Sequence, residues 1–274
     1  MNAAPDARPA ARSPAGFYGW WIVGLASLVG VLTGPGQSIG VSVFRQHLSD
    51  GLHLSDSAIA TAYLVGTLLS STLQPGIGRW VDQVGVRRAS TTFGIAFALA
   101  LAHMSMVRGV VWLAAGFFGI RLLGQGALSL TSTVAVMHWF DRRRGFALGL
   151  KMTLTMGGMS IVPILLAVAI DAWGWRIAWL AASAVIVLTA VPVSWFGYVN
   201  RPADMGQLPD GEPPVHVGQL GSAPPSLTRS TALRSTAFWA LAAVTATNSL
   251  LGTGLLFHQT NLLGEIGYSN AQAA

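Results

Sequence analysis

Long apolar runs separated by short polar clusters dominate this chain. Runs of membrane-spanning length, each with at most two charged residues, cover residues 17–44, 58–78, 89–107, 109–138, 145–171, 176–198 and 236–258. About 20 apolar residues, rising about 1.5 Å each along a helix, cross the hydrocarbon core of a bilayer. The pattern therefore predicts an all-α, multi-pass membrane protein.

The polar segments divide the chain into four predicted parts. Residues 1–16 form an N-terminal tail, and residues 17–198 hold six transmembrane helices in one bundle. Residues 199–235 are rich in Pro, Gly and polar side chains, a composition typical of a flexible linker. Residues 236–274 supply a seventh helix and the start of a further loop or helix.

Composition supports the membrane class and argues against several functions. Charged residues make up 9% of the chain, whereas a soluble domain carries about 25%. The chain has no cysteine, which excludes disulfides and thiolate chemistry. It also lacks the phosphate-loop, H-E-x-x-H and G-x-S-x-G patterns. We therefore expect a protein that is not an enzyme and that uses no cofactor or metal.

The net charge of +6 has two readings, nucleic-acid binding or membrane topology. If the N-terminus is cytoplasmic, three basic residues face outward: Arg45, Arg108 and Arg176. Twelve then lie on the cytoplasmic side: Arg8, Arg12, Arg79, Arg87, Arg88, Arg142, Arg143, Arg144, Lys151, Arg201, Arg229 and Arg234. This bias follows the positive-inside rule. It predicts a cell (inner or plasma) membrane location and a lipid, not a nucleic-acid, partner.

One basic residue, Arg121, falls near the middle of the run 109–138. A charge at that depth is costly and normally faces a water-filled cavity or a partner. Arginine also suits a carboxylate because its N–H groups donate in pairs. Arg121 is thus a candidate substrate or coupling residue; a structural ion pair and snorkelling to an interface are the alternatives. Gln125, between two glycines, would place an amide beside it.

The first span offers a second set of candidates in "TGPGQSIGVSVF", residues 33–44. Pro35 frees a backbone carbonyl and predicts a kink, and the glycines allow close helix packing. Gln37 and Ser38 follow the kink and are candidates to line a substrate cavity. Packing alone is the alternative reading of this segment.

Three further polar residues lie in apolar runs. Lys151 is a candidate coupling residue, although snorkelling to the cytoplasmic interface is the preferred reading. His258 is either a helix-end residue or a proton site. Asn248 serves either packing or substrate contact. Tryptophans near the span ends predict an interfacial belt: Trp20, Trp21, Trp112, Trp139, Trp173 and Trp175.

The stretch "GRWVDQVGVRR", residues 78–88, resembles the signature between helices 2 and 3 of the major facilitator superfamily. Gly78, Asp82, Gly85, Arg87 and Arg88 match that signature, and Gln83 and Val86 depart from it. The resemblance implies a gating loop about ten residues long that works against a second bundle.

"GFYGWWIV", "WFDRRRGFALGLKMTLTMGG", "RPADMGQLPDG" and "LLFHQTNLLGEIGYSNAQAA" are similar to segments of the monocarboxylate porter and oxalate/formate antiporter group. This resemblance implies the N-terminal part of a twelve-helix secondary transporter for small organic anions, proton-coupled or exchanging. The remaining C-terminal bundle of the same protein would be its partner. Two alternatives stay open: a transporter of uncharged or drug-like compounds, and a truncated fragment that does not transport.

Overall fold

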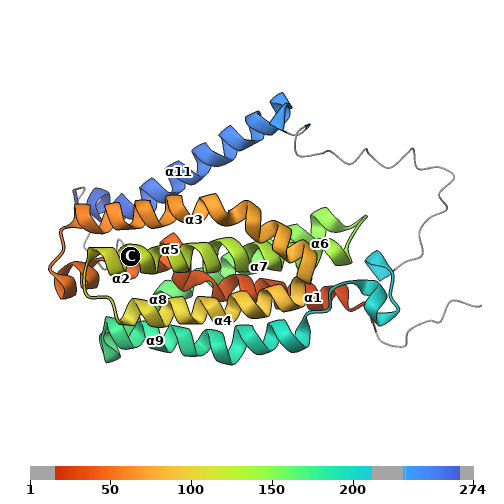
Figure 1. Ribbon diagram of the computed structural model, residues 1–274, viewed down its shortest axis with the longest axis horizontal. Coiled ribbons are helices and arrows are strands. Elements are labelled where there is room, and N and C mark those ends of the chain that lie inside the picture. Colours follow the sequence, from red (N-terminus) through yellow and green to blue (C-terminus); the bar gives the residue numbers. More distant parts are fainter. Residues whose placement is uncertain (1–15, 212–230, 232, 266–274) are drawn as a thin grey trace, which may run out of the picture.

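The computed structural model describes residues 16–211, 231 and 233–265, without the side chains of 253 and 255–265. These residues contain no β-strand, so the expected all-α class is confirmed. Most helices run side by side along one direction as a bundle, and α11 (Thr236–Glu265) lies obliquely along one flank (Figure 1). Within the described residues, α11 contacts α2.

The first predicted span is broken. It consists of α1 (Gly19–Leu32), a 3-10 turn η1 (Gly34–Gly36) and α2 (Ser38–Leu52). The kink predicted at Pro35 within the span 17–44 is thus a complete break of the helix. Proline has no N–H to donate to the helix. At Gly36 a side-chain carbon would come within 2.7 Å of the Ile120 carbonyl oxygen, so the break packs directly on the neighbouring helix.

The next two helices are separated by a single residue. The α3 helix (Asp56–Val84) begins with Ser55 accepting from the Ala58 N–H at 3.3 Å, and α4 (Val86–Ser105) follows directly after Gly85. The expected ten-residue loop is therefore mostly helix. Gly85 has φ 82° and ψ 158°, a conformation that is essentially restricted to glycine. That freedom is what allows the reversal in one residue.

The remaining elements form three helical stretches that are long and apolar enough to cross a membrane, at Val110–Trp139, Arg144–Trp173 and Trp175–Gly197. They comprise α5 (Val110–Ile120), the π-helical η2 (Arg121–Leu128), α6 (Ser129–Trp139), α7 (Arg144–Met159), α8 (Val162–Trp173), α9 (Trp175–Val185) and the π-helical η3 (Ile186–Ala190) and η4 (Val193–Gly197). The α3, α4 and α11 helices have 29, 20 and 30 residues and are more polar.

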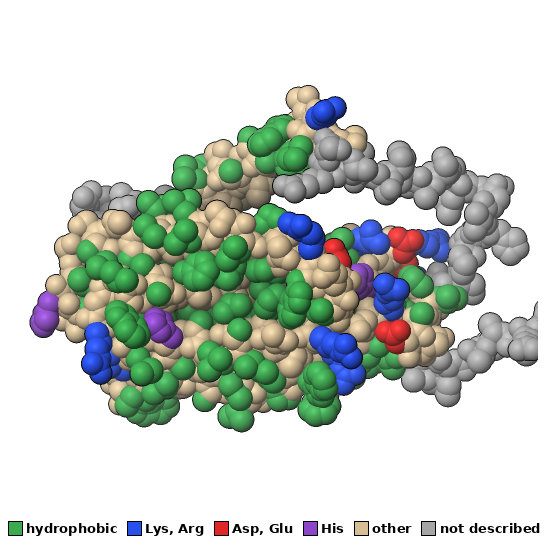
Figure 2. Space-filling view, viewed as in Figure 1, with side chains coloured by type: hydrophobic (Ala, Val, Ile, Leu, Met, Phe, Trp, Pro, Cys, Tyr) green, Lys and Arg blue, Asp and Glu red, His purple; other side chains and the backbone are tan. Residues whose placement is uncertain are grey.

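Apolar side chains fill the bundle and also cover its outside. Phe44 and Trp179 are fully buried, with ring centroids stacked at 3.9 Å. Many large apolar side chains are nevertheless exposed, among them Leu68, Val111 and Leu188. Figure 2 shows such side chains over the middle of the molecule. An apolar exterior of this extent fits a surface solvated by lipid.

Charged side chains gather at one end of the bundle (Figure 2). We call this the basic end; it comprises the start of α1, the Gly85 turn, the α6–α7 loop and residues 198–211. Its described basic residues are Arg79, Arg87, Arg88, Arg142, Arg143, Arg144 and Arg201. Arg45, Arg108 and Arg176 lie toward the opposite end. This is the same division that the sequence predicts for the two sides of the membrane.

The first residues of the predicted linker are ordered against the basic end. They form two short turns, η5 (Pro202–Met205) and η6 (Pro209–Gly211). The Trp139 ring nitrogen donates to the Val199 carbonyl at 3.0 Å, and Trp139 is fully buried. Residues 199–211 are therefore held against the bundle, and the linker over 199–235 stays a prediction. Trp139 does not belong to an interfacial belt.

Candidate functional site

Arg121 lies where three helices meet. It is the first residue of η2, and its Nη1 donates to Ser38 Oγ of α2 at 3.4 Å. Ser38 Oγ also shares a 2.8 Å hydrogen bond with the hydroxyl of Tyr63 on α3. The guanidinium carbon lies 5.1 Å from the centre of the Tyr63 ring, within cation–π range. Ser38, a candidate cavity-lining residue, is thus in contact with Arg121, although it is not among the residues that line the adjacent cavity.

The Arg121 side chain is buried, with 7% of the residue exposed. Within the described part of the chain no acidic side chain forms an ion pair with it; Arg45–Asp56 and Arg144–Asp141 are pairs near the two ends. Snorkelling is thus excluded, and no described structural ion pair explains the charge. Burying an unpaired charge costs several kcal/mol, so an anionic partner at this position would be strongly favoured.

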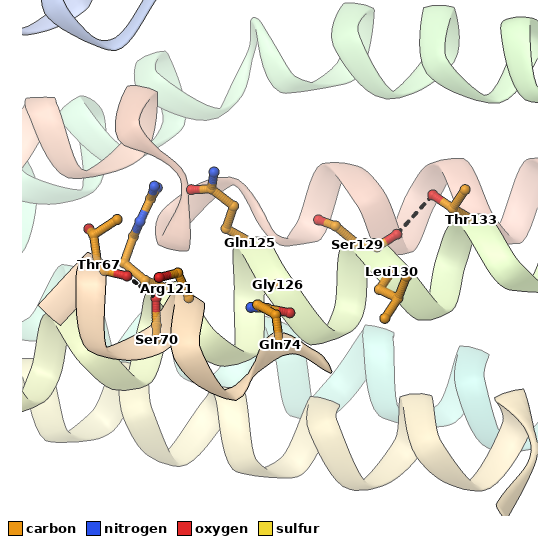
Figure 3. A pocket seen from close by; sticks show the side chains of 10 residues that line it. Thr67, Ser70, Gln74, Arg121, Gln125, Gly126, Ser129, Leu130 and Thr133 are labelled. Carbon is orange, nitrogen blue, oxygen red and sulfur yellow. Dashed lines mark hydrogen bonds between the residues drawn. The ribbon is translucent and has the colours of Figure 1, made fainter. Parts of the chain in front are cut away.

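A cavity of about 500 Å³ opens beside Arg121, between α3 and the η2–α6 helix. Its lining is mostly hydroxyl and amide side chains: Thr67, Ser70, Ser71, Gln74, Arg121, Gln125, Gly126, Ser129, Leu130 and Thr133. Figure 3 shows Arg121 and Gln125 extending in the same direction near one end and Thr133 at the other. The cavity has the size of a small-ligand site. None of its lining residues is acidic.

Glycine keeps the helices close around this cavity. A side-chain carbon at Gly124 would lie 2.6 Å from the Phe97 ring, and one at Gly126 would overlap the Gln74 amide. The triplet Gly124–Gly126 therefore brings Gln125 to the cavity while η2 packs on α4. Gln37 is placed differently: its amide donates to Thr33 Oγ1 at 3.1 Å across the break, and it does not line the cavity.

The signature residues surround the Gly85 turn at the basic end. The Arg87 N–H donates to Asn200 Oδ1 at 3.0 Å, and the Arg87 guanidinium lies 4.8 Å from the Trp195 ring centre. A side-chain carbon at Gly85 would meet Asn200 at 2.8 Å. Asp82 is exposed in the last turn of α3 and forms no ion pair with a described residue. The turn is thus held by Asn200 and not by a charge network around Asp82.

The family model of the Major Facilitator Superfamily matches residues 20–274. The chain belongs to that superfamily. Members of this family are transporters and not enzymes, as expected from the sequence.

Two further residues of the signature segment are placed by the structure: Gly78 lies within α3, and Arg88 is exposed on α4.

Known proteins similar to this major facilitator chain include monocarboxylate transporter 14 of Homo sapiens, 26% identical over 70% of this chain and 37% of that protein. The galacturonate transporter of Dickeya chrysanthemi is 24% identical over 69% of this chain and 54% of that protein. The oxalate:formate antiporter of Oxalobacter formigenes is 29% identical over 53% of this chain and 34% of that protein. The chain therefore spans about a third to a half of the length of these relatives.

The fold of this major facilitator chain is also similar to that of a solved transporter. A bacterial homolog to the human lysosomal transporter Spinster, in an inward-facing and unoccupied conformation, superposes with a TM-score of 0.70 at 16% identity. The match covers 94% of this chain and 58% of that chain. The described helices therefore have the major facilitator arrangement.

Lys151 is oriented differently from the preferred expectation. The residue is 6% exposed, and its Nζ donates to Thr133 Oγ1 at 3.3 Å. Because Thr133 lines the cavity, the ammonium lies directly behind the cavity wall. Snorkelling of Lys151 to the interface is therefore wrong.

Of the two candidates on α11, only Asn248 has a described side chain. Asn248 is exposed and does not line the cavity. The side chain of His258 lies outside the described residues, so its role stays a prediction. Asn248 is therefore not one of the residues that surround the cavity beside Arg121.

Sequence reasoning missed the contribution of α3 to the cavity. Thr67, Ser70, Ser71 and Gln74 have the spacing i, i+3, i+4, i+7, which places them on one helix face. Gln125, Ser129 and Thr133 follow Arg121 at intervals of four residues in the same way. A polar stripe inside an apolar run was the available signal. Tyr63 had no comparable signal, because its role depends on a contact between helices.

Proposed function

We propose that this chain forms the anion-binding half of a secondary active transporter for small organic carboxylates, in which Arg121 binds the carboxylate. Secondary transporters of this type bind substrate near mid-membrane and expose the site alternately to each side. The basic end faces the cytoplasm in this proposal, consistent with its excess of arginine.

The observation that carries the proposal is the buried guanidinium of Arg121 beside a cavity lined mainly by hydroxyl- and amide-bearing residues. Ser38 and Tyr63 orient the group, but neither neutralises its charge. A guanidinium presents its N–H donors in a planar fork that matches the two oxygens of a carboxylate. Gln125 adds an amide that can hydrogen-bond the same ligand.

The names of the relatives support the same substrate class. Monocarboxylate, galacturonate, oxalate and formate are all carboxylates. Since the chain covers only part of each relative, transport by the whole protein is inferred here from the family and from the cavity. The same proposal holds that transport is driven either by coupling to protons or by exchange for another anion.

The test is uptake by the full-length gene product in proteoliposomes with Arg121→Met. We expect uptake of labelled lactate, formate or oxalate to fall by about 100-fold or more, since losing a charge-assisted bidentate contact removes about 3 kcal/mol. The matched control is Arg108→Met, which removes an equal charge from an exposed position near the opposite end. That variant should keep near-normal uptake.

The same assay separates the rival substrate classes and the coupling modes. Competition by neutral or drug-like compounds but not by carboxylates, or an Arg121→Met protein with full uptake, would contradict the proposal. Acceleration by an inward proton gradient would indicate symport. Dependence on an internal carboxylate would indicate exchange.

A further inference from the structure

The second buried cation of the bundle, Lys151, is the feature that the central site does not explain. It lies two turns into α7, about 10 Å along the axis from Arg144. The Ser27 hydroxyl donates chiefly to the Val23 carbonyl at 2.7 Å and lies 3.4 Å from the Lys151 carbonyl, and the Thr155 hydroxyl donates to the Ser27 carbonyl at 3.4 Å. These contacts fix this face of α7 against α1. The side chain is thereby directed into the bundle toward α6.

The ammonium of Lys151 is incompletely satisfied. It carries three N–H donors, and within the described residues one hydrogen bond is present, to Thr133 Oγ1. Thr133 in turn donates to the Ser129 carbonyl at 2.9 Å, so its hydroxyl oxygen is oriented to accept from Lys151. No described acidic side chain pairs with this ammonium. Burying such an ammonium costs free energy, and an anion nearby would offset its loss of hydration.

The separation of Lys151 from Arg121 determines whether one small anion can contact both cations. Thr133 follows Arg121 by twelve residues, which corresponds to at most about 18 Å along the axis, because the π-helical η2 rises less per residue than an α-helix. A carboxylate of two or three carbons is much shorter and cannot contact both cations at once. Between them the cavity wall offers Gln125 and Ser129 on one helix. Figure 3 shows these side chains in sequence along the helix that carries Arg121 and Thr133.

We propose that Lys151, through Thr133, forms a second anion-binding position between the central site and the basic end. A carboxylate released by Arg121 would be held there before it leaves at the basic end, and one entering from that end would be held there first. The inference rests on the proposed function, because it assigns a second position to the same substrate. It also explains why this lysine is buried instead of extending to the interface.

The experiment compares the two faces of the full-length protein in proteoliposomes. The KM for formate or lactate is measured with substrate presented at the basic-end face and at the opposite face. Lys151→Met keeps the length of the side chain and removes the charge. We expect it to raise the KM at the basic-end face by about tenfold or more and to change the KM at the opposite face by much less. Lys151→Arg should restore the basic-end KM to within about threefold.

Thr133→Val is the second variant, since it keeps the shape of the side chain and removes only the hydroxyl. We expect a rise of about two- to fivefold in the KM at the basic-end face, as for the loss of one hydrogen bond. Arg108→Met again controls for net charge. The Tm of each detergent-purified variant is measured in parallel.

The outcomes separate the two hypotheses. If Lys151 instead pairs with an acidic residue beyond the described part of the chain, Lys151→Met lowers the Tm and leaves both KM values unchanged, and the second position is overturned. If Lys151→Met does not fold, an unchanged basic-end KM in Thr133→Val overturns it. If Arg121→Met loses uptake but the Lys151 variants keep the wild-type KM at the basic-end face, the second anion-binding position is overturned and the proposed function stands. If the wild-type protein takes up no carboxylate, both the proposed function and the second anion-binding position are overturned.

Discussion

At the scale of single residues, the site depends on how a few polar groups hold Arg121. Ser38 and Tyr63 come from two different helices, α2 and α3, and are hydrogen-bonded to each other beside the guanidinium. Their hydrogen bond fixes the Ser38 oxygen, and the Tyr63 ring supports the charge from its face. The arginine is therefore oriented before a ligand arrives, which lowers the entropy lost on binding.

The Tyr63 hydroxyl can be tested separately from its ring. Tyr63→Phe removes the bond to Ser38 and keeps the aromatic face near Arg121. We expect the KM for a carboxylate to rise about two- to tenfold with nearly unchanged kcat, because one neutral hydrogen bond contributes about 0.5–1.5 kcal/mol. Tyr63→Leu, which also removes the ring, should raise it further. Equal KM values for Tyr63→Phe and wild type would show that the hydroxyl does not position Arg121.

At the scale of elements, two segments of irregular backbone lie close to Arg121. The α1–α2 helix breaks at η1, and the neighbouring helix widens into the π-helical η2 that begins at Arg121. The two irregular segments are in contact, and Gly36 of η1 packs against the carbonyl of Ile120, the last residue of α5 before η2 begins. In membrane proteins such segments are tolerated where they are buried or line a water-filled cavity. Arg121 therefore lies at the start of an irregular segment that packs against the break in the first span.

The Gly85 turn gives a prediction at this scale. Gly85→Ala places a side chain at φ 82° and against Asn200, so both backbone strain and a close contact oppose folding. We expect a loss of about 1–3 kcal/mol and a lower Tm in detergent. Gly145→Ala is the control, because nothing lies within 4 Å of a side-chain carbon there. Equal Tm values for both variants would contradict the role of the turn.

At the scale of the whole molecule, the segment 198–211 connects elements that are distant in sequence. The Asp210 carboxylate accepts from the backbone N–H groups of Asp141, Arg142 and Arg143 at 3.1, 2.7 and 3.2 Å, immediately before α7. Helix N-termini favour an anion at this position. Gln207 and Asn200 make similar bonds to Tyr18 and Arg87. The segment therefore holds the starts of α1, α4 and α7 together at the basic end.

The pH dependence of stability tests this connection. Burial acts to raise the pKa of Asp210, but the hydrogen bonds from Arg142, Arg143 and Asp141 and the charge of Arg143 outweigh it and hold the pKa below its ordinary value of 3.8. A lowered pKa stabilises the fold above the ordinary value, and this contribution is lost as the pH falls through the lowered pKa. Asp210→Asn should therefore cost about 1 kcal/mol at neutral pH.

The measurement is the Tm of wild type and Asp210→Asn from about pH 6 to about pH 3. Asparagine also tolerates the positive φ of 60° found at this residue, so the variant changes charge with little backbone strain. The difference in Tm should shrink below about pH 4. A difference that stays constant over the whole range would show that the Asp210 charge does not stabilise the fold.

The sequence alone determined the membrane class, the sorting of arginines to one end, and Arg121 and Gln125 as residues inside an apolar run. These follow from composition and from a helical period of 3.6 residues, which are local properties of the chain. Only the tertiary structure decided that Lys151 points inward, that Tyr63 and the polar face of α3 complete the cavity, and that the signature segment turns on a single glycine. Contacts between helices depend on which faces pack together, and the periodicity of one helix does not specify its neighbour.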